Sequence, residues 1–228
     1  MIIVAFDTAS PSTVAGVLCA DGSVVEARDD PPEGSRGEHA ARLLVLIEQA
    51  LAQAGTGWSA VDRIAVGVGP GGFTGLRIGV ATARALAQGH GLPLVPVGSL
   101  EALALALALA TDGGEGAVAA VLDARRGEVF AGVWEDGRER FAPAAVAPHM
   151  LAGRLAQLAA PVRAVGDGAV RFRAELEAAG VSVPPDGASV HRISAGPLCR
   201  LGAAGEPAER DGLLPDYRRE PDAKPPQQ

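Results

Sequence analysis

A glycine-rich segment contains the residues best suited to bind an anion. It reads GVGPGGFTG over residues 67–75 and follows a short apolar run that is typical of a strand. The helical pattern behind it would offer free N–H groups in its first turn, and such groups attract phosphates and carboxylates. A tight turn from strand to helix needs the same glycines. The segment alone therefore indicates either a ligand loop or a structural turn.

The sequence disfavours a dinucleotide site and excludes a Walker A loop. Gly67, Gly69 and Gly72 satisfy G-x-G-x-x-G, but a dinucleotide site also needs an acidic residue about 20 positions later, and residues 81–100 contain none. A Walker A loop or a Schiff-base site needs a lysine, whereas the only lysine is Lys224 in the tail and the other basic residues are all arginine. We expect neither a nicotinamide or flavin fold nor a P-loop enzyme.

Two aspartates could hold a metal. Asp7 and Asp123 each end an apolar run, where actin-like ATPases keep metal-linked carboxylates, but an aspartate there also commonly bonds a turn. No nucleophile motif is present, and no histidine pair has metal-ligand spacing; the four histidines are His39, His90, His149 and His191. The sequence predicts no catalytic residue and no metal site.

Hydrophobic periodicity predicts the elements that must position these residues. We expect strands over 2–7, 12–18 and 23–27, a helix over 38–54, a strand over 63–68, a helix over 76–88 and a strand over 94–97. A helix that links two strands in this order implies a parallel crossover added to an antiparallel meander. This is the order of a ribonuclease H-like layer.

The pattern then repeats. FDTASPSTVAGVLCADG surrounds Asp7 and LDARRGEVFAGVWEDG surrounds Asp123, and a helix over 148–158, a strand over 163–165 and a helix over 170–179 follow. We expect an α/β fold of two tandem ribonuclease H-like lobes joined by a helix over 100–110, as in the actin-like ATPase (ASKHA) superfamily. The predicted lobes are 1–100, which carries the partner-binding helices, and 101–217; a flexible polar tail occupies 218–228. The cleft between such lobes holds nucleotide in that superfamily.

The second predicted helix has a face of small residues. Gly75, Gly79, Ala83 and Ala87 lie four apart, so another backbone can approach closely, either within the lobe or from a second protein. The helix over 38–54 has two apolar sides. Together the two helices predict half of a protein interface.

Composition indicates a folded protein that does not bind nucleic acid by itself. The 228 residues are 48% hydrophobic and 21% charged, and the net charge of -7 would repel a phosphate backbone. The longest apolar run, LALALALA, is far shorter than a membrane span, no leader pattern begins the chain, and the two cysteines form no motif. We expect a cytoplasmic protein without a membrane segment.

Several sequence blocks resemble one protein family. AFDTAS, GVGPGGFTGLRIGVATARALA, PVGSLEALA and LDARRGEVF, in this order, resemble the bacterial tRNA threonylcarbamoyladenosine biosynthesis family TsaB, also called YeaZ, over residues 2–217. The chain departs from the family pattern at two places. Gly72 replaces the usual serine, and PDYRR replaces the usual Pro-x-Tyr-Leu-Arg, which leaves the tail contact and its effect on partner binding open.

The resemblance implies a non-catalytic relative of the metal-bearing subunit TsaD. Such a chain would pair with TsaD through the helices over 38–54 and 76–88 and support transfer of threonylcarbamoyl from its adenylate to the adenosine beside the anticodon. The implied partner-binding residues are His39, Leu43, Leu46, Ile47, Ala50, Gly75, Gly79, Ala83 and Ala87. The implied vestigial phosphate or nucleotide loop comprises Asp7, Thr8, Gly69, Gly71, Gly72 and Thr74.

The resemblance also implies further partners. The ATPase TsaE would be a third component, and tRNA would be reached only through the complex. This chain alone would bind no cofactor, because ATP and a metal belong to the partner subunits. Without TsaD the same helices could form a homodimer.

Three alternatives remain at this level. An active phosphotransferase of the actin or sugar-kinase type would need magnesium-dependent nucleotide binding by the chain alone. A peptidase would need a nucleophile or metal motif that the sequence lacks. A homodimeric interaction module would use the same helices.

Overall fold

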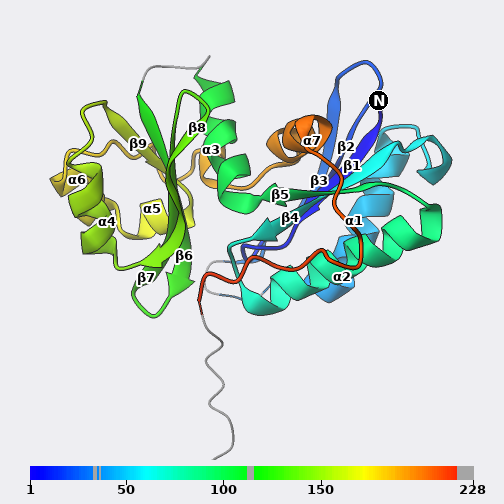
Figure 1. Cartoon of the computed structure of the whole chain (residues 1–228), viewed down its shortest axis with the longest axis horizontal. Coiled ribbons are helices and arrows are strands. Elements are labelled where there is room, and N and C mark those ends of the chain that lie inside the picture. Colours follow the sequence, from blue (N-terminus) through cyan, green and yellow to red (C-terminus); the bar gives the residue numbers. More distant parts are fainter. Residues whose placement is uncertain (33–34, 36, 112–115, 220–228) are drawn as a thin grey trace, which may run out of the picture.

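The protein folds into two α/β lobes that lie side by side (Figure 1). The computed structural model describes residues 1–32, 35, 37–111 and 116–219, so most of the predicted tail over 218–228 lies outside the described residues. Each lobe contains one mixed sheet, and two helices lie between the sheets.

The first sheet has the strand order β3-β2-β1-β4-β5. Its first three strands form an antiparallel meander and the last two run parallel to β1, as the sequence predicts. Their bounds are β1 Ile3–Asp7, β2 Thr13–Leu18, β3 Val24–Asp29, β4 Arg63–Gly69 and β5 Leu94–Gly98. Both faces of β1 are buried, because Ile3 and Ala5 enter one core while Val4 and Phe6 enter another. Helices must therefore cover the sheet on both sides.

Two helices cover one face of this sheet and two cover the other. α1 (His39–Gln53) and α2 (Phe73–His90) pack on the face of Val4 and Phe6, and α3 (Ser99–Ala110) and α7 (Ala195–Ala204) on the opposite face. A single 3-10 turn, Trp58–Ala60, precedes β4. α2 begins three residues earlier than predicted because Gly72 is extended and the helix starts directly after it.

The second sheet has the order β8-β7-β6-β9. Its bounds are β6 Ala117–Arg125, β7 Glu128–Glu135, β8 Arg138–Val146 and β9 Val162–Val165, and β9 is parallel to β6. The outer face is covered by α4 Pro148–Leu155, α5 Asp167–Arg171 and α6 Arg173–Ala178, and the 3-10 turn Ser189–His191 follows. The single helix predicted over 170–179 is wrong: the chain leaves helical geometry at Phe172, which separates α5 from α6.

The chain returns to the first lobe at α7. This helix, which was not among the elements predicted from the sequence, contacts β1, β2 and β4. Ala208 then bridges Leu94, and the Asp216 N–H donates to the Val68 carbonyl at 2.8 Å. The predicted range 101–217 for the second lobe is therefore too long at its C-terminal end, because the apolar side of α7 is buried on the first sheet.

None of the helices in the described part of the chain combines the length and apolar composition of a membrane span.

Candidate functional site

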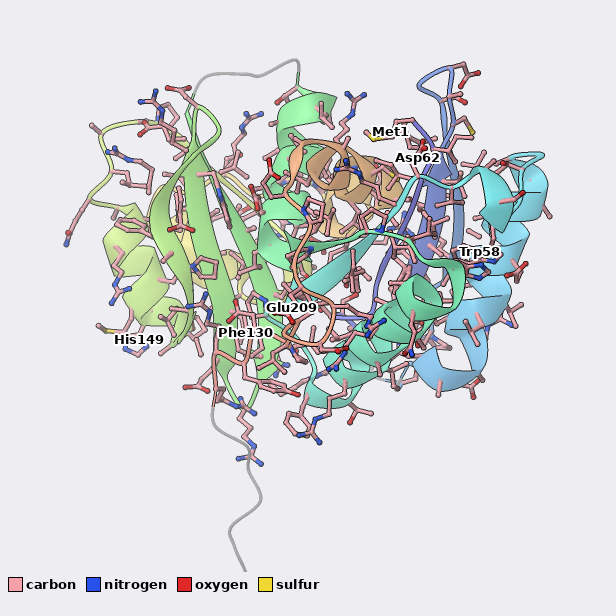
Figure 2. All side chains as sticks on the ribbon, turned by 45° about the vertical axis from the view of Figure 1, so that its right-hand side comes forward. Met1, Trp58, Asp62, Phe130, His149 and Glu209 are labelled. Atoms are coloured by element: carbon pink, nitrogen blue, oxygen red, sulfur yellow. The ribbon has the colours of Figure 1, made fainter. Side chains whose placement is uncertain are left out.

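A cleft of about 1080 Å³ lies between the two lobes. The first lobe lines it with the loop after β1 and the starts of α1 and α2, over residues 8–11, 37–41 and 71–75. The second lobe contributes residues 122–125 at the end of β6, together with Phe130 and Asp167. Figure 2 shows Phe130 on the side of the second sheet that faces the first lobe. Both predicted candidate regions, the glycine-rich segment and the two strand-end aspartates, are therefore close to this cleft.

Asp7 does not reach the cleft. Its side chain is buried, with 1% of the residue exposed. One carboxylate oxygen accepts the Ala9 N–H at 2.6 Å, and the Ser99 hydroxyl donates to the other at 2.5 Å. Burial raises the pKa of Asp7, and the hydrogen bonds from Ser99 and Ala9 oppose that rise. Asp7 closes a turn and anchors the start of α3, so a direct role at the cleft is not supported.

Asp123 lies at the cleft but is already paired. Its Oδ2 is 2.7 Å from Arg171 and 3.5 Å from Arg125, and its Oδ1 accepts the Arg125 N–H at 2.8 Å. Asp167 accepts the Asp123 N–H at 2.9 Å. Burial and the neighbouring charge of Asp123 raise the pKa of Asp167, against the hydrogen bond from the Asp123 N–H. The second lobe therefore presents a carboxylate that two arginines neutralise.

The described residues contain no cluster of side chains that could bind a metal ion. Within residues 1–32, 35, 37–111 and 116–219, no three or more His, Cys, Asp or Glu side chains gather closely enough to hold an ion.

The glycine-rich segment lies against the loop that follows β1. The Gly72 N–H donates to Ala9 O at 2.7 Å, and the Thr8 hydroxyl donates to Gly75 O at 2.8 Å. A Cβ on Gly71 would lie 2.6 Å from the Ala9 Cβ, so only glycine permits this approach. The glycines therefore allow close packing of the two loops. This favours the structural turn, which is one of the two explanations that the sequence left open.

The predicted loop residues have different surroundings. Thr8, Gly71, Gly72 and Thr74 line the cleft, whereas Asp7 and Gly69 are buried beside it. Gly69 has a φ of +112° and precedes a cis bond to Pro70. The first turn of α2 keeps the N–H groups of residues 73–75 without acceptors among the described residues. The anion-binding capacity predicted for this helix start therefore stays a prediction.

All nine predicted partner-binding residues are buried. In α1 the four apolar ones, Leu43, Leu46, Ile47 and Ala50, pack on the first sheet. In α2, Gly75 and Gly79 face Thr8, and Ala83 and Ala87 belong to the same core. His39 lies in the wall of the cleft. Apolar and small residues at helical spacing mark the face that packs on the helix's own sheet. These residues therefore stabilise the first lobe, and their role in partner binding stays a prediction.

The outward faces of α1 and α2 carry large apolar side chains. Leu44 and Val45 are 52% and 53% exposed, and Phe73 is 40% exposed. Leu44 belongs to the second apolar side that the sequence indicates for the helix over 38–54, whereas Val45 and Phe73 were missed because the buried stripe dominates the pattern. We name Leu44, Val45 and Phe73 the outer helix face.

The C-terminal segment spans the cleft, a feature that the sequence left open. The Arg77 guanidinium lies 3.8 Å from the centre of the Phe73 ring, and its Nε donates to the Tyr217 hydroxyl at 2.9 Å. Arg219 donates to the Ala124 carbonyl in the second lobe at 2.8 Å. The departure from Pro-x-Tyr-Leu-Arg therefore still leaves Tyr217 bound to the first lobe and Arg219 to the second.

The two mixed sheets and the interlobe cleft define a two-lobed α/β protein with an actin-like fold. The ROK hexokinase from Thermus thermophilus superposes with a TM-score of 0.54 at 15% identity, over 90% of this chain and 99% of that chain. Similarity at this level shows the shared fold. The predicted fold class is thus confirmed.

Relatives with higher sequence identity show the family to which this chain belongs. The family profile "TsaD: tRNA N6-adenosine threonylcarbamoyltransferase" matches residues 31–187. The protein named tRNA threonylcarbamoyladenosine biosynthesis protein TsaB is 34% identical in Escherichia coli, over 74% of this chain and 72% of that protein. Its Haemophilus influenzae counterpart is 45% identical over 40% of this chain, an alignment that spans 38% of that protein's length. YeaZ from Pseudomonas aeruginosa superposes with a TM-score of 0.74 at 28% identity, over 95% and 99% of the two chains. The chain belongs to the TsaB (YeaZ) family.

Proposed function

We propose that this chain takes part in forming threonylcarbamoyladenosine on tRNA, as a non-catalytic partner of a TsaD-type transferase. It would support transfer of threonylcarbamoyl from its adenylate to the adenosine next to the anticodon. The observation that carries the proposal is family membership, because two relatives that align with 74% and 95% of the chain bear the names TsaB and YeaZ. The match to the TsaD profile supports a common origin with the proposed partner.

The state of the two strand-end aspartates supports a non-catalytic role. The carboxylate of Asp7 is bonded by Ser99 and Ala9, and that of Asp123 by Arg171 and Arg125. A carboxylate that bound a magnesium nucleotide would have to leave these partners first. ATP and a metal ion would then act in the partner subunits, as the family resemblance implies.

The outer helix face is the proposed docking surface for TsaD. Leu44, Val45 and Phe73 are exposed on neighbouring helices of the first lobe, and Arg77 beside Phe73 supplies a charged rim. An apolar centre with an arginine rim is the usual composition of a specific interface. The same surface could pair two copies of this chain when TsaD is absent.

Two further partners complete the proposal. The ATPase TsaE would join the complex, and tRNA would be contacted through the partners, because the net charge of this chain is -7. A tRNA-modifying complex works where its tRNA substrate is, so the proposal places the chain in the cytoplasm.

Calorimetric titration with the TsaD of the same organism tests the docking surface. We expect the wild type to bind and Leu44→Glu or Val45→Glu to weaken binding at least tenfold, because a charge would be buried in an apolar interface at a cost above about 1.4 kcal/mol. The matched control is Met150→Glu in the second lobe, where the side chain is 52% exposed and outside the proposed surface. It should bind as the wild type does.

Calorimetry and size-exclusion chromatography test the rival function, an active phosphotransferase. The isolated chain is titrated with magnesium-ATP, and size-exclusion chromatography with and without TsaD reports homodimer and heterodimer. Strong ATP binding without any response to TsaD would overturn the proposal in favour of a phosphotransferase. Equal TsaD affinity of folded Leu44→Glu and Val45→Glu variants would instead reject the proposed surface.

A further inference from the structure

The C-terminal segment, residues 213–219, is held at both ends and passes from one lobe to the other. Its first residue, Leu213, is 5% exposed and belongs to the core between α1, α2 and the first sheet. Its last residue, Arg219, donates to the Ala124 carbonyl at 2.8 Å and lies 3.4 Å from Glu128, both in the second lobe. Figure 1 shows the segment running past α2 toward the second sheet. The segment therefore connects two lobes that α3 also joins.

Two contacts hold the middle of the segment on the first lobe. The Asp216 N–H donates to the Val68 carbonyl at the end of β4, at 2.8 Å. The Tyr217 ring lies 5.1 Å from the Phe73 ring, and the Tyr217 hydroxyl accepts a hydrogen bond from Arg77 Nε at 2.9 Å. The last contact with the first lobe is thus only two positions before the contact of residue 219 with the second lobe.

The same residues lie between two cavities. Tyr217 and Arg219 are in the wall of the large cleft. Asp216 is in the wall of a smaller cavity of about 290 Å³, which Gly69 of the first lobe and Trp134 of the second lobe also line. Both cavities are bounded by the two lobes. The segment therefore fills part of the space between the lobes, and a change in its position must change that space.

The segment is held loosely beyond its buried first residue. Residues 213–218 form no helix or strand, and none of residues 214–219 is buried. Leu214 is 70% and Tyr217 43% exposed. Segments with few buried apolar contacts open at a low free energy, and neighbouring contacts in such a segment depend on each other. Loss of the contact at Tyr217 should therefore also weaken the contact at Arg219.

We infer that the C-terminal segment is a latch that couples the surface around Phe73 and Arg77 to the spacing of the two lobes. While Tyr217 stays on this surface, it positions Arg219 at the second lobe and keeps the spacing narrow. Loss of either contact weakens the other, because the coupling between two sites is reciprocal. The latch goes beyond the proposed function and involves this chain alone.

The latch has a consequence for partner binding. Phe73 belongs to the outer helix face, and Tyr217 packs beside it. A protein bound to this face would meet Tyr217, so docking and lobe spacing would influence each other. This consequence alone rests on the proposed function.

Distances between spin labels on the full chain, without any partner, test the latch. Labels at Gln49→Cys in α1 and Met150→Cys in α4, with Cys19→Ser, report the spacing of the lobes. We expect Arg77→Ala to broaden the distance distribution as Arg219→Ala does, although residue 77 is on a helix of the first lobe. The double variant should be no broader than the broader single variant, because both changes release one latch.

Arg84→Ala is the matched control for Arg77→Ala. Arg84 is an arginine of the same helix and lies 3.6 Å from Asp211, so it also contacts the C-terminal part of the chain. That contact precedes the buried Leu213, which separates it from the latch. We expect the distance distribution of Arg84→Ala to equal that of the wild type.

Amide hydrogen exchange measures the coupling from the opposite end. The Asp216 N–H, bonded to Val68 O, reports whether the segment lies on the first lobe. Arg219→Ala removes the hydrogen bond to Ala124 in the second lobe. We expect exchange of the Asp216 N–H to become roughly tenfold faster, the effect of losing one hydrogen bond that involves a charged group.

Three results would overturn the inference. The first is a wild-type distance distribution in Arg77→Ala, the second is additive broadening in the double variant, and the third is unchanged Asp216 exchange in Arg219→Ala. Circular dichroism checks that each variant is folded. If Arg219→Ala does not fold, the comparison of Arg77→Ala with Arg84→Ala still decides. Since the chain is measured alone, failure of the latch and failure of TsaD docking are distinguishable.

Discussion

At the scale of single residues, the two strand-end aspartates are stabilised in different ways. Asp7 lies in the core and receives a hydroxyl and a backbone N–H, both neutral donors. Asp123 lies at the cleft and is held by two arginines. A buried carboxylate with only neutral donors keeps part of its desolvation cost, so the stability of the protein should depend on the ionisation of Asp7.

The pH dependence of Asp7→Asn measures that cost. The pKa of Asp7 is raised from 3.8 in the folded chain, so the folded state binds a proton more strongly than the unfolded state. Its contribution to stability is present below about pH 4 and is lost as the pH rises through the folded pKa. The free energy of unfolding of Asp7→Asn, relative to wild type, should therefore rise with pH. Urea unfolding at several pH values from about 4 upward checks this, and a constant difference would contradict it.

At the scale of elements, the glycines of α2 have two distinct environments. A Cβ on Gly79 would overlap the Thr8 hydroxyl, whereas a Cβ on Gly89 in the same helix would meet nothing within 4 Å. The first glycine lets the helix approach the loop after β1. Gly89 lowers the helix propensity without allowing any close contact, because no neighbouring atom lies near its Cβ position.

Alanine substitutions should separate these environments. We expect Gly79→Ala to lower the free energy of unfolding by about 1 to 3 kcal/mol through overpacking against Thr8. Gly89→Ala should raise it by about 0.5 to 1 kcal/mol through better helix propensity. Urea unfolding measures both. Equal effects of the two substitutions would show that the approach of α2 to Thr8 is not tightly packed.

At the scale of the whole molecule, the C-terminal segment connects the lobes. Tyr217 packs on Phe73 in the first lobe, and Arg219 donates to Ala124 O in the second and lies 3.4 Å from Glu128. The segment passes the cleft that both lobes line (Figure 1). We therefore expect it to limit opening of the cleft.

Arg219→Ala should loosen the lobes relative to each other. Spin labels at Gln49→Cys in α1 and Met150→Cys in α4, with Cys19→Ser, report the distance between the lobes. We expect a broader distance distribution in Arg219→Ala because the hydrogen bond to Ala124 is lost. Arg218→Ala is the matched control, since Arg218 pairs with Asp216 in its own segment. Identical distributions for both variants would assign the lobe arrangement to α3 and α7 alone.

Most elements of the first lobe, the repeat and the fold class could be predicted from the sequence. Alternating and helical apolar spacing, turn residues and the second Asp-strand pattern are local signals, and they predicted the first sheet and helices α1 to α3 closely. Family membership was likewise carried by contiguous blocks that the comparisons confirm. These features could be predicted because each depends on residues near one another in the chain.

Which faces are buried, and which distant groups bond to each other, followed from the packing of elements far apart in the sequence. Ser99 lies 92 positions from Asp7, and α7 crosses back to a sheet that begins at residue 3. The apolar stripe of α1 and the small-residue stripe of α2 were found, but their burial against the first lobe depended on packing. Such contacts depend on how distant elements meet in space, a relation that local spacing does not encode.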